Sequence, residues 1–452
     1  MQKRDTIDRR TFVRLGTAVG AVALAGCTDF DDTNEEQDDE NETGSDDTDE
    51  NGEGNGDDVA APEIIEVEDP PEAVYVPTHR EAMRMLETVE AGDFRLAPML
   101  SYPHPFWVIA GGGNAEDEVE RVPPEDGRGV HMMFTLWDAE TGIVLPVDEG
   151  AQLRVFQDGE QVGSPRSPWA MISQEMGFHF GDNVPLPEDG TYSVEVTIPS
   201  ISTTKTGDLD GRLDESQTAT FEFEYDDEFR HEVVGGVEYF DEEVWGNEGA
   251  IEPMDHGHHG SDEHGEHDGT HHEESEHGDG HDHNEHGDDH ENGHGHDDHH
   301  VPYSALPRVD EYPGTRLVDP DTEGDVEETI DLPRSGDAAI LASVFEPGSR
   351  LADGDEQYLL VSPRTPYNRV PLADMSLRAV VERDGEVVLE QSLEQTIDSE
   401  YDLHYGLSTP DIEPGDSVTI EIESPPQVAR HQGYETAFLD MPPVELTVPE
   451  GD

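Results

Sequence analysis

Cysteine is almost absent from this chain, since Cys27 is the only one among 452 residues. A single cysteine excludes an intramolecular disulfide and a metal site built from several thiolates. Basic residues are also scarce: 24 Lys and Arg stand against 109 Asp and Glu, which gives a formal net charge of −85. Such a surface would repel phosphate and so excludes nucleic acid as a partner. Because concentrated salt is needed to screen this self-repulsion, the composition predicts a halophilic protein of archaeal type.

Long apolar runs are equally rare, and the clearest one lies near the N-terminus. It extends from Leu15 to Gly26 and is too short to cross about 30 Å of hydrocarbon. The run follows a twin-arginine pattern at Arg9-Arg10 and ends in a Leu-Ala-Gly-Cys sequence that is typical of a lipobox. We therefore predict a twin-arginine lipoprotein signal over residues 1–27, with Cys27 as the lipidated residue. The alternative is a secreted chain without the lipid.

The predicted signal implies export across the membrane and a lipid anchor in its outer leaflet. Residues 28–62 are acidic and show no apolar periodicity, which predicts a disordered tether between the anchor and the folded part. The predicted localisation is the extracytoplasmic face of the cell membrane.

Histidine is the residue that the chain has in excess. Sixteen of its 23 histidines lie between residues 256 and 300, in an acidic, glycine-rich stretch with almost no apolar residue. An acidic spacer has no need of imidazole, whereas imidazole is a common ligand of iron, copper and zinc. We predict that residues 251–301 form a disordered linker that buffers transition-metal ions. Its candidate ligands are His256, His258, His259, His271, His272, His281, His283, His299 and His300.

The remaining chain forms two β-rich regions, residues 63–250 and 302–452. Alternating or β-branched segments predict strands at residues 130–137, 153–156, 192–198, 221–225, 377–381, 418–422 and 444–448. Short strands between Gly, Pro and Asp turns predict an all-β fold of two antiparallel β-sandwich domains. A short helix is predicted over Arg80–Val89.

The two regions are similar to each other in sequence. Both contain a Leu-Arg strand followed by an Asp-Gly turn, at residues 152–162 and 376–387. Phe178-His179-Phe180-Gly181 corresponds to Leu403-His404-Tyr405-Gly406, and Gly190 corresponds to Gly415, at a constant offset of 225 residues. The order and spacing of these matches predict a tandem duplication.

Two segments resemble the periplasmic iron-transport protein family. Residues 169–194 contain a methionine, then Phe-His-Phe-Gly-Asp-Asn and a strand that begins Gly-Thr-Tyr. They are similar to the family's Met-containing segment, its His-Tyr-Gly-x-Asn motif and its Gly-Tyr-led strand. Residues 424–436, with Pro-Pro, Arg-His and Glu-Thr, resemble the family's Pro-Pro … Arg-His … Glu-Thr-Gly segment. The resemblance implies immunoglobulin-like β-sandwiches that bind copper or iron through His and Met and assist iron uptake as a dimer.

The resemblance also implies a set of ligands, with two departures from the family pattern. The implied ligands are His131, Met171, His179, His404 and His431. Arg212-Leu213 stands where the family has Arg-His, and Glu356 or Gln357 stands near the place of a second His131. Three arrangements remain open: a partial site in each region, one site shared by both, or a fold without a site.

Enzymatic motifs are missing from the sequence, which has no HExxH, P-loop or G-x-S-x-G pattern, so we predict a protein that is not an enzyme. The predicted function is transition-metal binding at the cell surface, with delivery of iron, copper or zinc to a membrane permease. The predicted partners are the membrane, the permease, and either a second copy of the chain or the pairing of its own two domains. The alternative is a non-enzymatic surface scaffold or adhesion lipoprotein. Imidazole ligands discriminate poorly among metals and leave the ion unnamed.

Overall fold

The computed structural model describes most of the chain beyond the predicted tether. The described residues are 62, 64–109, 119–124, 128–254, 301–303, 314–320, 332–352, 354–409 and 412–449. They all belong to one compact unit, residues 59–452. The predicted signal with Cys27, the tether and the candidate ligands between His256 and His300 lie outside the described residues. None of the described helices is long and apolar enough to cross a membrane.

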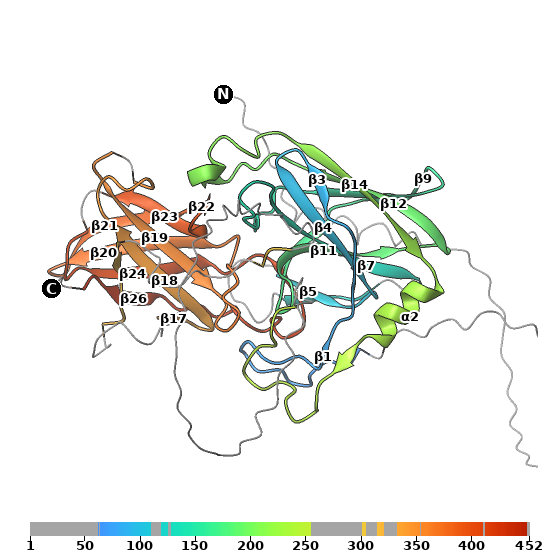
Figure 1. Ribbon diagram of the computed structural model, residues 1–452. Helices are drawn as coiled ribbons and strands as arrows, with labels where there is room; N and C mark the ends of the chain where they lie inside the picture. Colours follow the sequence, from blue (N-terminus) through green and yellow to red (C-terminus); the bar gives the residue numbers. More distant parts are fainter. Residues whose placement is uncertain are drawn as a thin grey trace, which may run out of the picture. The chain divides into compact units, whose positions relative to one another are not determined.

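The fold is all-β, as predicted, and consists of two immunoglobulin-like sandwiches (Figure 1). In the first repeat a nine-stranded sheet faces a four-stranded sheet. The larger sheet has the order β2 (Arg84–Met85), β4 (Phe94–Ser101), β7 (Gly129–Asp138), β11 (Gly177–Pro185), β10 (Trp169–Ser173), β25 (Ala429–Arg430), β5 (Phe106–Ile109) and β6 (Val119–Val122), with β3 (Val89–Ala91) paired to β4. The smaller sheet has the order β14 (Gln217–Tyr225), β12 (Gly190–Ile198), β8 (Gln152–Gln157) and β9 (Glu160–Arg166).

The second repeat has the same plan, with seven strands facing four. Its larger sheet has the order β13 (Thr204–Thr206), β22 (Glu394–Asp398), β23 (Asp402–Thr409), β19 (Gln357–Arg364), β18 (Ala338–Phe345) and β16 (Thr315–Arg316), with β17 (Arg334–Ser335) paired to β18. Its smaller sheet has the order β21 (Glu386–Ser392), β20 (Ser376–Arg383), β24 (Ser417–Ser424) and β26 (Val444–Thr447). A separate ladder joins β1 (His79–Arg80) to β15 (Glu238–Tyr239).

The period-2 pattern of the strands explains the core of each sandwich. On β12 the alternate residues Tyr192, Val194, Val196 and Ile198 are buried, and the residues between them are partly exposed. Each fully buried Val or Ile side chain contributes about 1.5–3 kcal/mol relative to exposure. The Asp158-Gly159 turn has positive φ at both residues, as a two-residue hairpin requires.

The two repeats exchange one short strand each. Strand β13 follows β12 of the first repeat but pairs in parallel with β22, with Thr204 opposite Thr396. Strand β25 follows β24 of the second repeat but pairs in parallel with β10, with Ala429 opposite Met171. Both pairings obey the offset of 225 residues, which confirms the tandem repeat. The exchange brings the loop after β25 onto the first repeat.

The predicted helix over Arg80–Val89 is wrong, because β2 and the start of β3 lie there and pair with β4. Helix propensity is a weak preference that pairing to a sheet edge can override. The one α-helix among the described residues is α2 (Asp227–Gly235), which follows β14 and buries Phe229. The Asp226 side chain caps it by accepting a hydrogen bond from the Phe229 backbone N–H. A single 3-10 turn, η2, spans Gly207–Leu209.

Candidate metal site

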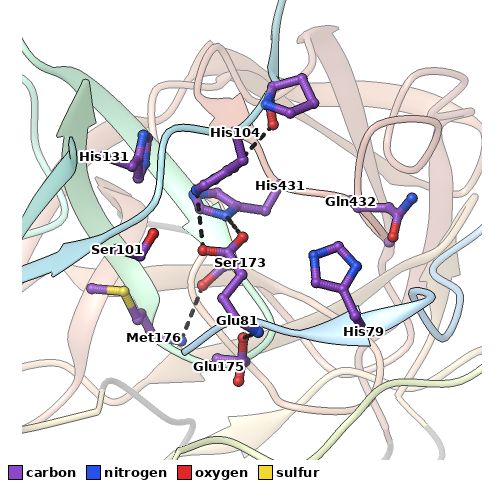
Figure 2. A network of polar contacts seen from close by, with 12 residues as sticks. His79, Glu81, Ser101, His104, His131, Ser173, Glu175, Met176, His431 and Gln432 are labelled. Atoms are coloured by element: carbon purple, nitrogen blue, oxygen red, sulfur yellow. Dashed lines mark hydrogen bonds and ion pairs between the residues drawn. The ribbon is translucent and has the colours of Figure 1, made fainter. Parts of the chain in front are cut away.

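Four buried histidines meet on the face of the nine-stranded sheet that points away from the four-stranded sheet. His131 comes from β7, His179 from β11, His104 from the loop between β4 and β5, and His431 from the loop after β25. Nitrogen atoms of His104, His131 and His431 lie within 4.8 Å of one another (Figure 2). The His179 Nε2 atom lies 3.1 Å from the His431 Nε2 atom. The site therefore takes ligands from both repeats.

Hydrogen bonds to the outer nitrogen of each ring determine where its lone pair lies. The His131 Nδ1 atom lies 3.1 Å from Asn183 Oδ1, and the Asn183 amide group donates to the His104 backbone carbonyl, which fixes its orientation. The His179 Nδ1 atom lies 3.1 Å from the Gly177 carbonyl oxygen. Each acceptor places the proton on Nδ1 and leaves the Nε2 lone pair directed inward.

The other two rings follow the same rule. The His104 Nδ1 atom lies 3.1 Å from the Pro105 carbonyl oxygen, and the His431 Nδ1 atom lies 3.2 Å from Glu81 Oε1. The Nε2 lone pairs of His179 and His431 thus face each other at 3.1 Å, which is repulsive unless a cation or a proton lies between them. The His131 Nε2 atom has no hydrogen-bond partner among the described residues. The donor set therefore fits a metal ion.

Glu81 supplies negative charge to this cluster (Figure 2). Its side chain is 13% exposed, and its Oε2 atom lies 3.0 Å from His104 Nε2. Burial raises the pKa of Glu81, but His104 and His431 outweigh burial and hold that pKa well below its usual value. Burial lowers the pKa of His104, but the Glu81 carboxylate outweighs it and raises that pKa. A carboxylate fixed in its charged form favours a cation in the site.

Burial keeps the other rings neutral. It lowers the pKa of His179 to about 3, with a further contribution from His431. It also lowers the pKa of His131 well below its usual value, with His104 and His431 adding to the effect. Neutral imidazole is the form that binds metals, so these rings are ready to bind at neutral pH.

Met171 and Gly181 complete the surroundings of the site. Met171 on β10 pairs with His179 on β11. A Cβ atom added to Gly181 would lie 2.9 Å from Met171 Sδ and 3.1 Å from His131 Nε2. Glycine thus leaves open the space toward which a thioether and an unpartnered imidazole nitrogen both point.

The equivalent place in the second repeat has different chemistry. His404, at the position of His179, directs Nδ1 to the Asp402 carbonyl oxygen, and its Nε2 atom lies 3.1 Å from the Tyr358 hydroxyl. Asp398 is fully buried and pairs with Arg350, whose Nη2 atom lies 2.6 Å from Asp398 Oδ1. This second locus, made of His404, Tyr358, Asp398 and Arg350, is satisfied by protein groups alone.

Comparison with known proteins gives one family match. Residues 310–447 match a domain of unknown function (DUF7350). The matched range covers most of the second repeat and includes β25 with His431. No curated protein matches the chain.

The structure brings four of the implied ligands together: His131, Met171, His179 and His431. His404 lies apart from them in the second repeat. Of the three arrangements left open by the sequence, the structure has the one in which both repeats share a cluster. Two members were missed: His104, a lone histidine between two prolines, and Glu81, one carboxylate among many. Only the His-x-Glu spacing of His79 and Glu81 could have drawn attention to the latter.

The strand registers correct two of the assumed equivalences. Tyr358, and neither Glu356 nor Gln357, stands where His131 stands, because it occupies the same pairing position beside β23. Thr206, rather than Arg212-Leu213, stands at the position of His431, because β13 and β25 pair at equivalent registers. Arg212 instead forms an ion pair with Asp138 at 2.9 Å.

Proposed function

We propose that this protein is a lipid-anchored, extracytoplasmic carrier of a transition-metal ion, iron, copper or zinc, which it delivers to a membrane permease. The observation that carries the proposal is the convergence of four buried imidazoles whose Nε2 lone pairs point at one another. Such an arrangement is electrostatically unfavourable without a cation. The proposal assigns no enzymatic reaction to the chain.

The donor set supports a first-row transition metal as the cargo. Imidazole nitrogen and thioether sulfur favour iron, copper and zinc over the hard cations Mg²⁺ and Ca²⁺, which prefer oxygen ligands. The Glu81 carboxylate would offset part of the charge of a divalent ion. The combination of His and Met agrees with the resemblance to periplasmic iron-transport proteins, from which we take the role in metal uptake.

The ends of the His-rich stretch support a role for its sixteen histidines in capture. Residue Met254, just before the stretch, donates its backbone N–H to the Glu175 carbonyl at 3.0 Å. Tyr303, just after it, donates its hydroxyl to the Gln174 carbonyl. Gln174 and Glu175 line a cavity of about 30 Å³ together with Glu81 and His431. The stretch thus leaves and re-enters the fold beside the site, and we propose that it collects ions for it.

Equilibrium dialysis of the full-length chain tests this proposal. The sixteen histidines between residues 256 and 300 are replaced by serine, which keeps the chain length and isolates the folded site. In sulfate brine of at least about 1 M, which screens the net charge, we expect one Zn²⁺ or Cu²⁺ per chain with micromolar or tighter affinity. The unmodified chain should retain several more ions. If neither chain retains an ion, the proposal fails and the surface-scaffold alternative takes its place.

A further inference from the structure

A second group of soft donors lies on the same face of the nine-stranded sheet. Met99, Met133 and Met176 are 0%, 0% and 3% exposed, and they pack together with Trp137 and Val301 in a cluster separate from the main core. Met83 packs against this cluster from outside. No charged side chain belongs to the cluster.

The methionine cluster adjoins the histidine site. Met99 on β4 lies directly opposite Met133 on β7. The Met133 Cγ atom lies 3.4 Å from the point above Gly181 where a Cβ would stand, and Met171 Sδ lies 2.9 Å from the same point. The Met176 backbone N–H donates to Ser173 Oγ at 3.0 Å, which holds the turn between β10 and β11 beside the site (Figure 2). Thioethers therefore continue from Met171 along the sheet.

The second repeat provides an internal control for packing. The pairing registers place Leu360 at the position of Met133 and Ser343 at that of Met99, and the repeat offset places Tyr401 at that of Met176. The cluster on that face of the second repeat contains Leu, Phe, Tyr and Ala and no methionine among the described residues. Because buried methionine loses more rotamer freedom than leucine, packing alone gives no reason for three methionines in the first repeat.

We propose that Met99, Met133 and Met176, with Met171 at the border, form a thioether subsite that takes a soft monovalent cation, Cu⁺. Thioether sulfur selects Cu(I). The absence of a carboxylate from the cluster suits an ion of single charge, which costs less to bury without a counter-ion than a divalent one. This inference rests on the proposed function, because it gives the carrier a second position for its cargo. It involves no electron transfer, since the copper arrives already reduced.

Silver ion tests the subsite in the full-length chain labelled with ¹³C-methyl methionine. Ag⁺ stands in for Cu⁺, and sulfate brine replaces chloride, which would precipitate silver. We expect the methyl signals of Met99, Met133 and Met176 to shift on titration until silver exceeds all histidines. Met375 and Met441, buried in the second repeat at 7% and 8% exposure, should stay unchanged. A titration that shifts Met171 alone, or that moves only the exposed Met85, overturns the proposal.

Leucine variants separate this inference from the proposed function. The triple variant Met99→Leu, Met133→Leu, Met176→Leu keeps nearly the same volume and should fold, which the unchanged spectrum of the remaining methyl groups checks. We expect it to bind Ag⁺ at least about tenfold more weakly, with Zn²⁺ binding at the histidines unchanged. His431→Ala should show the reverse pattern. Unchanged silver affinity in the triple variant, or in the three single variants if the triple does not fold, refutes the subsite without affecting the histidine site. Loss of Zn²⁺ binding alone refutes the proposed function.

Discussion

The two repeats build the same pair of sheets around two loci of opposite character. In the first, four imidazoles direct Nε2 lone pairs toward one another, and His131 Nε2 has no partner among the described residues. In the second, the Tyr358 hydroxyl faces the one imidazole, His404, and Arg350 neutralises the buried Asp398. The fold is shared, so the difference must come from the side chains at equivalent positions.

The exchanged strands show how the two loci diverge. The loop after β25 gives His431 to the first repeat, and the equivalent residue of the first repeat, Thr206, donates its hydroxyl to Asp398 in the second. A histidine adds an inward lone pair, whereas a threonine adds a donor to a carboxylate that already has an arginine. One locus therefore requires a cation from solution, and the other receives its cation from the chain.

The largest expected effect compares equivalent histidines across the repeats. In the chain whose residues 256–300 lack histidine, His431→Ala should weaken Zn²⁺ binding by about 100-fold or more, ~2.8 kcal/mol, because it removes a ligand and the partner of Glu81. His404→Ala should leave the affinity unchanged, since Tyr358 is its partner. Competition against a chromophoric chelator measures both. Equal losses would erase the proposed distinction between the loci.

Arg350→Ala should break the second locus without touching the first. The variant leaves the buried Asp398 carboxylate without its guanidinium partner. Because the Arg350 side chain is 38% exposed and the pair is partly screened, we expect a loss of about 1–3 kcal/mol in the free energy of unfolding. Denaturant unfolding in sulfate brine measures it, and Zn²⁺ affinity should not change. Arg378→Ala, which removes a surface ion pair with Glu390, serves as the matched control and should cost less.

Equivalent glycines offer a sharper comparison of the same two places. Gly181→Ala puts a methyl group 2.9 Å from Met171 Sδ and 3.1 Å from His131 Nε2, and should weaken metal binding by filling the space between them. Gly406→Ala puts the methyl group against the Tyr358 ring and should cost about 1–3 kcal/mol of stability with no change in metal affinity. Titration calorimetry and denaturant unfolding of both variants check the pair. A metal-binding defect in Gly406→Ala would contradict the assignment.

Mild acid should produce the smallest difference. Burial lowers the pKa of His404 to about 4 and that of His179 to about 3, so the unfolded chain takes up these protons first, near its own pKa of about 6.5. Each ring therefore contributes stability above pH about 6.5 that is lost as the pH falls toward the folded value, roughly 1 kcal/mol per ring by pH 5.5.

The metal distinguishes the two rings in this titration. Zn²⁺ should suppress the acid loss from His179, which a bound ion protects from protonation, and should leave the loss from His404 in place. Unfolding midpoints measured between pH 7 and pH 5, with and without Zn²⁺ and in His404→Asn, test the expectation. A loss from His404 that Zn²⁺ removes would place a metal at the second locus.

Particular residues show how far the sequence could predict the site. Met171, His179 and His431 followed from the resemblance, because each lies in a short motif with its own spacing. His104 and Glu81 lie in or beside loops, where no periodicity marks a residue as inward-facing. His404 was implied by the repeat alone, and that argument failed because its neighbours Tyr358 and Thr396 are not a histidine and a methionine.

The sequence by itself determined the all-β class, the strands at the alternating segments and the repeat at an offset of 225 residues, because pattern and spacing are local properties of the chain. Only the tertiary structure decided which histidines meet. That outcome depends on the reciprocal exchange of β13 and β25, which joins residues more than two hundred positions apart. It also depends on which outer nitrogen of each ring finds an acceptor, and so on where each lone pair points.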